Sequence, residues 1–398
     1  MSYATESQAA GRHILPDLTR AFAVLGIVLV NVAYLAWPGE VTYHDGGLIT
    51  SLDTAAYFGV NALFLFKAYT LFSLMFGVGL AYQMQSAERR GLPFGRRYIR
   101  RLLGLIILGI LHVTFAFTGD VLIVYALMGA ILYAFRNKPV KSLLRWGIAL
   151  IILQILIVLA FAGALYSGET YAPDEMAKSV TEMKANFPKY YAIFGEGGFS
   201  EIARQRWTDW VGYLAFAGPT QMPGILAFFI LGLALVKSGA IANPNASLWK
   251  KARWVALPIG LLISLFAAYL TTTIENPISS GATLGMALII IGAPFSTLGY
   301  MGLIAKWAAG RDSGLRTFIA RGGTATLTAY LLQSLILSLV FCGYGLGLYG
   351  KISAAGCIGI AAATGIFTLC FASLWRKKFA RGPFEYLLRR FTYWGSVR

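Results

Sequence analysis

Residues 143–166 read LLRWGIALIILQILIVLAFAGALY, a run of 24 positions in which the only charged side chain is Arg145. About 20 consecutive apolar residues are enough for an α-helix to cross the hydrocarbon core of a bilayer. A helix satisfies its backbone hydrogen bonds internally, which a chain crossing lipid must do because no water is available there. The stretch therefore predicts a transmembrane helix.

Nine further hydrophobic runs accompany this one, and the whole chain is 57% hydrophobic and only 13% charged. Soluble domains are about one quarter charged, so the composition excludes an ordinary soluble fold. The sequence predicts an all-α, polytopic integral membrane bundle of about ten transmembrane helices, forming a single membrane domain over residues 1–398. The fourth and sixth spans are short; the ten spans are 18–37, 55–84, 99–118, 121–136, 143–166, 222–237, 254–273, 281–305, 325–347 and 354–375.

Charge sorts between the two sides of this predicted bundle. With a cytoplasmic N-terminus, 27 of the 34 basic residues fall on the cytoplasmic side and 12 of the 17 acidic residues on the outer side. Lys and Arg in short loops favour the cytoplasmic side, so both termini are predicted to be cytoplasmic. The net charge of +17 is then mainly a topology signal that also attracts anionic lipids. Nucleic acid needs no role in this interpretation.

The three cysteines, Cys342, Cys357 and Cys370, all fall inside predicted spans. Buried cysteine usually behaves as a small hydrophobe, so no disulfide framework and no metal site are predicted. Only Arg12 precedes the first span among basic residues, and no small-residue cleavage site follows it. The first span is therefore expected to be a retained helix and not a removed signal peptide.

Two segments outside the spans have helical character. Residues 167–221 form an extracytoplasmic helical excursion between spans five and six, in which Ser200 resembles an N-cap and Trp207 and Trp210 recur at helical spacing. Such a helix either packs and anchors at the bilayer surface or contacts substrate at a cavity mouth. Residues 376–398 form a basic cytoplasmic amphipathic tail, restarted after a break at residues 382–385.

The second span is too long for an untilted crossing and is interrupted by Lys67. Its depth places this lysine in the outer leaflet region, where ionisable side chains usually pair or face a cavity. Snorkelling to the outer interface is the alternative.

The third span carries the most informative polar residues. Arg101 and His112 are eleven residues apart, which puts them about 20° from one helix face and about 16 Å apart along the axis. Asp120 follows at the outer turn. A histidine and a carboxylate at similar depth are suited to general base catalysis, with the carboxylate orienting the imidazole. The alternative interpretation is a histidine that makes a hydrogen bond between helices and serves only their packing.

Other polar positions are weaker candidates. Asp17 and Arg20 have the spacing of an ordinary helix-end pair, and Asn31 lies on the same face as Arg20. His44 lies in an outer loop. Tyr330, Gln333 and Ser334 in span nine are interpreted as hydrogen-bonding contacts between helices.

Several of these motifs resemble the YeiB-like family of bacterial inner-membrane proteins, a domain of unknown function designated DUF418, along nearly the whole chain. The matching residues are Asp17-Leu18-Thr19-Arg20 to Asn31, residues 71–77, residues 109–112 with 119–122 and Tyr125, residues 327–334, and residues 382–386. One departure is Ala21, where the family usually has glycine. The resemblance implies a multi-pass protein of the bacterial inner membrane.

The family is distantly similar to a wider superfamily of transmembrane acyltransferases. In the surface-polysaccharide members, an Arg followed by ten residues and a His is a signature, and Arg101 to His112 has that spacing. Those members carry a His in span one where this chain has Asn31. The heparan-type members resemble this chain in having Asn there, with a catalytic His in the following loop, a role that His44 would fill.

The leading hypothesis is a membrane acyltransferase that moves an acyl group from cytoplasmic acyl-CoA, such as acetyl-CoA, to a small-molecule, glycan or lipid acceptor at the outer face. His112 would be the base, Asp120 would orient it, and Lys67 would stabilise the oxyanion. Tyr125 and Gln333 are additional candidates, and a homodimer is left open. The CoA phosphates would contact the arginines Arg96, Arg97, Arg100, Arg101 and Arg20.

Two other classes remain open at this stage. A proton-coupled transporter of a small organic or anionic solute would use the same intramembrane ionisable residues. A scaffold or sensor would use them only for assembly.

Overall fold

The computed structural model describes residues 13–39, 46–91, 93–274, 276 and 278–394, and every regular element within them is a helix. Nine of these helical segments are long and apolar enough to cross a membrane. The predicted all-α multi-pass bundle is therefore confirmed. The nine are α2 (Ile14–Ala36), α4 (Ser51–Leu63) with α5 (Lys67–Glu88), α6 (Gly95–Phe115), α8 (Val140–Tyr171), the second part of α11 (Phe199–Lys237), α12 (Ser247–Lys251) with α13 (Leu257–Thr273), α14 (Ser280–Ala308), α15 (Gly314–Gly322) with α16 (Thr326–Phe341), and α17 (Ala354–Lys378).

The predicted fourth span is the short helix α7 (Leu122–Ala134). Its 13 residues extend about 20 Å, less than the roughly 30 Å hydrocarbon core. The turn before it is covered by protein, since Phe117 is buried in one cluster with Phe194 and Tyr349. Irregular backbone is tolerated at membrane depth where protein buries it, so α7 does not need to reach the outer surface.

The predicted excursion at 167–221 is divided differently from the expectation. Helices α9 (Pro173–Ala185) and α10 (Phe187–Glu196) form its first part. Its second part is continuous with the sixth span as the 39-residue helix α11, whose N-cap is Gly198 and not Ser200. Trp210 is buried against Val113, so this segment packs into the bundle.

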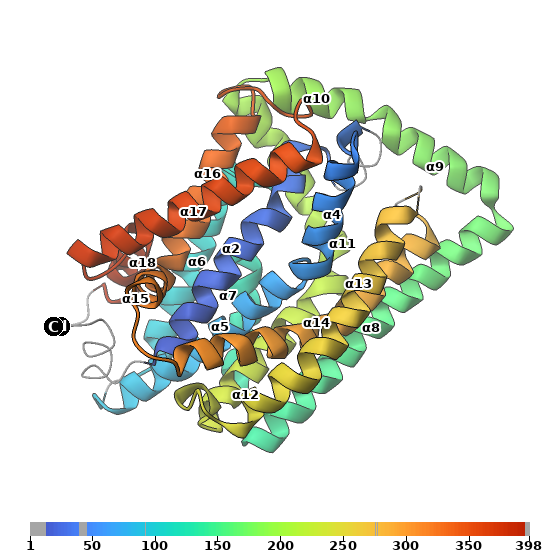
Figure 1. Ribbon diagram of the computed structural model, residues 1–398. Coiled ribbons are helices and arrows are strands. Elements are labelled where there is room, and N and C mark those ends of the chain that lie inside the picture. The colour runs from blue at the N-terminus through green and yellow to red at the C-terminus, as the bar shows by residue number, and fades with distance from the viewer. Residues whose placement is uncertain (1–12, 40–45, 92, 275, 277, 395–398) are drawn as a thin grey trace.

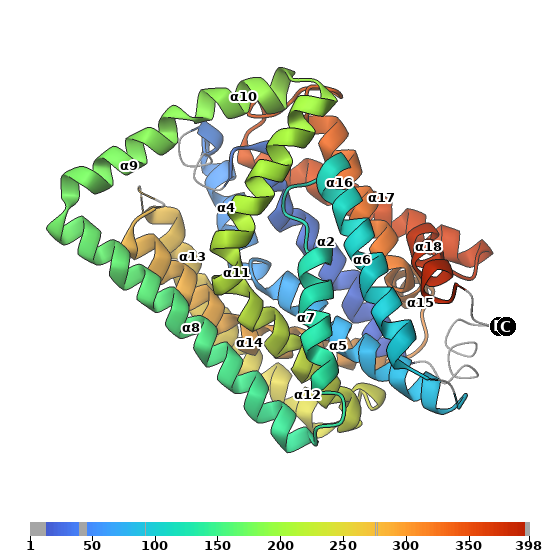
Figure 2. The same ribbon diagram turned by 180° about the vertical axis from the view of Figure 1, so that it is seen from behind.

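The two ends of the bundle are distinct in Figures 1 and 2. The end that carries α12, α15 and the tail helix α18 (Pro383–Thr392) is called the basic end here, and α9 and α10 lie at the opposite end. Helices α8 and α13 run along one edge of the molecule. Only 17% and 22% of their apolar windows are buried, which leaves an apolar outer surface suited to lipid.

The centre of the bundle is a crossing between α5 and α11. A Cβ on Gly77 would overlap the Phe229 carbonyl oxygen, and a Cβ on Gly232 would overlap the Leu74 carbonyl oxygen. The two backbones therefore approach each other closely at reciprocal glycines, a common way for membrane helices to pack. The largest buried cluster forms around this crossing with residues of α2, α6, α7 and α16.

The long second span is broken into α4 and α5. Phe66 at the break has φ 62°, in the left-handed region. Lys67 starts α5 immediately after it and is fully buried. The length of the predicted span, which exceeded one untilted crossing, is thus explained by a discontinuous helix.

Candidate functional site

A single uninterrupted helix carries both Arg101 and His112. Helix α6 begins at Gly95 and ends at Phe115, so the predicted common face and the separation of about 16 Å apply. Arg101 lies toward the basic end and is half-buried, whereas His112 is 3% exposed near the other end of the helix.

His112 and Asp120 form a buried pair, as their spacing predicted. His112 Nδ1 lies 2.9 Å from Asp120 Oδ1, and Asp120 is 0% exposed. The second carboxylate oxygen of Asp120 accepts a 2.9 Å hydrogen bond from the backbone N–H of Ile123 in the first turn of α7. The carboxylate therefore holds the imidazole and the start of α7 together.

The other nitrogen of the imidazole has no partner. His112 Nε2 is buried without a hydrogen bond to any described residue, and the Tyr330 hydroxyl is buried within hydrogen-bonding reach of the Val121 backbone. The two rings are adjacent, with centroids 4.9 Å apart. An ionised carboxylate only accepts hydrogen bonds, so it fixes the hydrogen of a neutral imidazole on Nδ1 and leaves Nε2 as the acceptor.

A cavity of about 330 Å³, called the chamber here, lies between this pair and the basic end. Leu105, Leu122 and Tyr125 line it together with Phe72. His112 and Asp120 are not among its lining residues. Tyr330 lies between the chamber and the His112–Asp120 pair, because its ring centroid is 6.4 Å from that of Phe72 and 4.9 Å from that of His112.

A second cavity of about 380 Å³, called the vestibule here, adjoins the chamber at the basic end. The two cavities share Arg101, Tyr98 and Glu385 in their walls. The vestibule is strongly basic; its arginines are Arg90, Arg97, Arg101, Arg376, Arg381 and Arg389.

The predicted phosphate-binding arginines are only partly brought together. Arg101 lines both cavities, Arg97 lines the vestibule, and Arg20 lines the chamber while pairing with Asp17 at 3.0 Å. Arg96 is exposed and lines neither cavity. Arg100 also lines neither, and donates instead to the carbonyl of Trp394.

Lys67 does not join the His112–Asp120 pair. Its Nζ donates to the Asn61 carbonyl oxygen at 3.2 Å, across the break between α4 and α5. Within the described residues no hydrogen bond or ion pair links it to His112 or Asp120. The sequence placed it by depth alone, and depth does not determine which side of the bundle a residue faces.

The additional candidates have different surroundings. Tyr125 lines the chamber and its hydroxyl lies 2.6 Å from Ser73 Oγ. Gln333 is buried and donates to Thr368 Oγ1 at 3.0 Å, which agrees with a contact between helices. Asn31 is half-buried and lines neither cavity. His44 lies outside the described residues.

Sequence reasoning missed two features of the site. The sequence predicts Tyr330 as a contact between helices, and it predicts the arginines at 376, 381 and 389 only as parts of a basic amphipathic tail. The second prediction overlooked Glu385, the acidic residue of the tail. Its carboxylate accepts from the backbone N–H of Leu327 at 2.8 Å and from Thr328 Oγ1 at 2.5 Å, which fastens α18 to the first turn of α16.

Burial raises the pKa of Glu385, while the hydrogen bonds from Thr328 and Leu327 act in the opposite direction. The same contacts position α18 as a wall of both cavities, since Leu388 lines the chamber and Arg389 lines the vestibule.

The described part of the chain holds no group of three or more His, Cys, Asp or Glu side chains that could bind a metal ion together.

Fold and site together define a multi-pass α-helical membrane protein with a buried His–Asp pair and a two-part cavity that opens at its basic end. The chain belongs to the DUF418 family, which confirms the predicted YeiB-like membership. The family described as "Protein of unknown function (DUF418)" matches residues 235–395.

The relatives extend along the whole chain. "Uncharacterized protein YxaH" of Bacillus subtilis (strain 168) is 30% identical over 95% of this chain and 93% of its own length. "Uncharacterized protein YeiB" of Escherichia coli (strain K12) is 30% identical over 96% of both chains. A 39.9 kDa protein of Bacillus acidopullulyticus is 26% identical over 95% of this chain and 92% of its own length. No solved structure matches the chain.

Proposed function

We propose that the protein is an acyltransferase of the bacterial inner membrane, which moves an acyl group from cytoplasmic acyl-CoA to a hydroxyl or amine of an acceptor at the outer face. The observation that carries the proposal is the buried Nε2 of His112, which has no hydrogen-bond partner among the described residues while Nδ1 is held by Asp120. This is the arrangement a general base requires. The family's resemblance to the transmembrane acyltransferase superfamily agrees with it.

In this reaction His112 Nε2 takes the proton of the acceptor as the acceptor atom attacks the thioester carbonyl carbon. The C–S bond then breaks, and the CoA thiolate takes the proton from the imidazolium. Asp120 stabilises the imidazolium and does not move. The buried Tyr330 hydroxyl, whose ring is adjacent to His112, would donate to the carbonyl oxygen as negative charge develops there.

The cavities give the donor a route. The thioester arm would enter through the vestibule and the chamber, and Phe72 and Tyr330 would have to turn aside before it meets His112. Arg101 and His112 are separated by about 16 Å along α6, a span comparable to an extended pantetheine arm.

The test uses the full chain in neutral nanodiscs with acetyl-CoA and longer acyl-CoAs, and with a membrane extract as acceptor. We expect release of CoA thiol and transfer of labelled acyl group. His112→Asn should lower the rate about 100-fold or more, the usual contribution of a general base. His13→Asn is the control, because His13 lines neither cavity. No turnover by the wild type, or full turnover by His112→Asn, overturns the proposal.

One observation favours a second candidate, proton-coupled transport of a small anionic solute. The break between α4 and α5 leaves a fully buried lysine at a discontinuous helix, and discontinuous helices form the substrate sites of many transporters. Proteoliposomes that take up solute with protons, without thiol release, would support this candidate. Lys67→Met should then abolish uptake, whereas Lys351→Met, at an exposed lysine, should not.

A further inference from the structure

The vestibule has a large imbalance of charge. Among the described residues, six arginines line it and Glu385 is the one acidic residue in its wall. The oxygens of Glu385 already accept hydrogen bonds from Leu327 and Thr328, so this carboxylate is occupied by the first turn of α16. No ion pair in the described part of the chain joins this carboxylate to Arg101 or Arg389.

The cations in this wall are all arginines, although 13 of the chain's 34 basic residues are lysines. Topology alone is satisfied by either type, since Lys and Arg both mark the cytoplasmic side. A guanidinium presents several N–H donors in a planar fork that matches phosphate oxygens. The composition of the wall therefore favours phosphate recognition over orientation alone.

The wall is assembled from segments far apart in the sequence. Arg97 and Arg101 come from α6, whereas Arg389 comes from α18, which packs against α6 and α16. Tyr393 fixes this arrangement, because the guanidinium carbons of Arg97 and Arg389 lie 5.1 Å and 4.2 Å from its ring centroid. Arg101 and Arg389 donate no hydrogen bond to any described residue, which leaves their N–H groups available.

The shape of the two cavities restricts what binds. The vestibule is polar and basic, and the chamber behind it is lined mainly by leucine, methionine and aromatic side chains. A ligand that fills both needs a phosphate-bearing head and an arm that tolerates apolar walls. Pure inorganic phosphate or a simple hydrocarbon would leave half of the space unused.

We infer that the vestibule binds the phosphate groups of an amphiphilic substrate, and that Arg389 of the tail contacts them together with Arg97 and Arg101. The inference rests on the proposed function, in which this ligand is the acyl donor. It changes the residue set predicted from the sequence, because Arg96 and Arg100 do not line the vestibule and three arginines beyond residue 375 do. A phosphorylated lipid shares this chemistry with CoA.

The experiment measures binding to the full chain in phosphatidylcholine nanodiscs. The probes are CoA, dephospho-CoA, pantetheine and a short-chain phosphatidic acid. Arg389→Gln is compared with Arg390→Gln, a matched control because Arg390 is the next residue, is exposed and lines neither cavity.

We expect Arg389→Gln to raise the Kd for CoA about tenfold or more, as loss of a charge-assisted hydrogen bond does. Arg390→Gln should change it less than about twofold, and pantetheine should bind weakly to all variants. Equal effects of the two substitutions, or equal affinity for CoA and pantetheine, overturn the phosphate site. If phosphatidic acid alone binds, with the same dependence on Arg389, the ligand is a lipid phosphate.

These outcomes separate the site from the proposed reaction. Binding of CoA that depends on Arg389, without any release of thiol, would contradict the proposed transferase reaction and support the phosphate site. Thiol release that depends on His112 but is unchanged by Arg389→Gln would contradict the phosphate site and support the transferase.

Discussion

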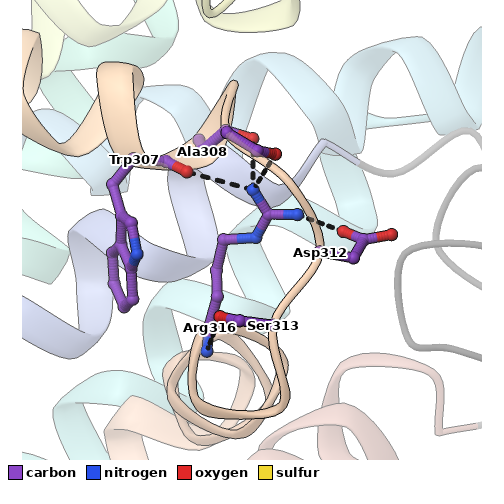
Figure 3. Close-up of polar contacts among 6 residues, drawn as sticks. Trp307, Ala308, Asp312, Ser313 and Arg316 are labelled. Atoms are coloured by element: carbon purple, nitrogen blue, oxygen red, sulfur yellow. Dashed lines mark hydrogen bonds and ion pairs between the residues drawn. The ribbon is translucent and has the colours of Figure 1, made fainter.

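At the scale of single residues, some arginines at the basic end are structural. Arg316 is 3% exposed and donates to the carbonyl oxygens of Trp307 at 3.0 Å and Ala308 at 3.1 Å, and also to Gly310 and Asp312 (Figure 3). A cation that binds the last carbonyls of a helix also complements the negative end of its dipole. Arg316 therefore caps the C-terminus of α14.

Arg316→Ala should lower the free energy of unfolding by about 2–4 kcal/mol, because several buried carbonyls would lose their donor at once. Arg311→Ala is the matched control, since Arg311 is exposed in the same loop. Thermal unfolding of the purified variants in detergent measures the difference. Equal midpoints of thermal unfolding for the two variants would contradict this prediction, since water would then satisfy these carbonyls as well as the guanidinium does.

Residues within one helix were predictable from the sequence because helical geometry is fixed. The relation of Arg101 to His112 needed only the 3.6-residue repeat, and Asp120 lies only eight residues further along the chain. Lys67 was not placed correctly, because its direction depends on the left-handed residue at the break of the second span. The tail arginines were missed because their position depends on Glu385 contacting a helix that begins 59 residues earlier.

At the scale of elements, the bundle depends on the α5–α11 crossing. Gly77→Ala should lower the free energy of unfolding by about 1–3 kcal/mol, because the added methyl group would overlap the Phe229 carbonyl oxygen and force the two helices apart. Size-exclusion chromatography and thermal unfolding in detergent measure the loss of folded monomer.

Gly163→Ala in α8 is the control for this substitution, because a Cβ there would meet nothing within 4 Å. Alanine favours a helix interior over glycine by about 0.5–1 kcal/mol, so this variant should be as stable as the wild type or slightly more stable. A Gly77→Ala protein that behaves like Gly163→Ala would contradict the close approach of the two backbones.

Element boundaries were less predictable than element existence. The hydrophobic runs located the spans, since apolar length is nearly sufficient to define them. They did not show that residues 199–221 continue into the sixth span, because the polar residues Glu201, Arg204 and Asp209 also fit an amphipathic helix at the bilayer surface when burial by neighbouring helices is unknown. Arg206 in that segment is 1% exposed and donates to Ser338 and Tyr344.

At the scale of the whole molecule, the structure places the basic loops at one end, and orientation is the choice of which side of the membrane that end faces. The loop after α7 belongs to this end, because Lys237 Nζ donates to the Lys138 carbonyl oxygen at 2.9 Å, and α9 lies at the opposite end. The excess of Lys and Arg in these loops favours a cytoplasmic basic end.

Single cysteines in a background lacking the three native ones test this orientation. Asn137→Cys lies in the exposed loop after α7, and Ser179→Cys lies on the exposed helix α9. In intact cells a membrane-impermeant maleimide should label position 179 at once and position 137 only after permeabilisation, because both positions are exposed but lie at opposite ends of the bundle. A cytoplasmic basic end keeps position 137 from the reagent until the membrane is opened. Labelling of position 137 in intact cells would place the basic end outside. The vestibule would then face away from cytoplasmic acyl-CoA, and the direction of the proposed transfer would have to be reversed.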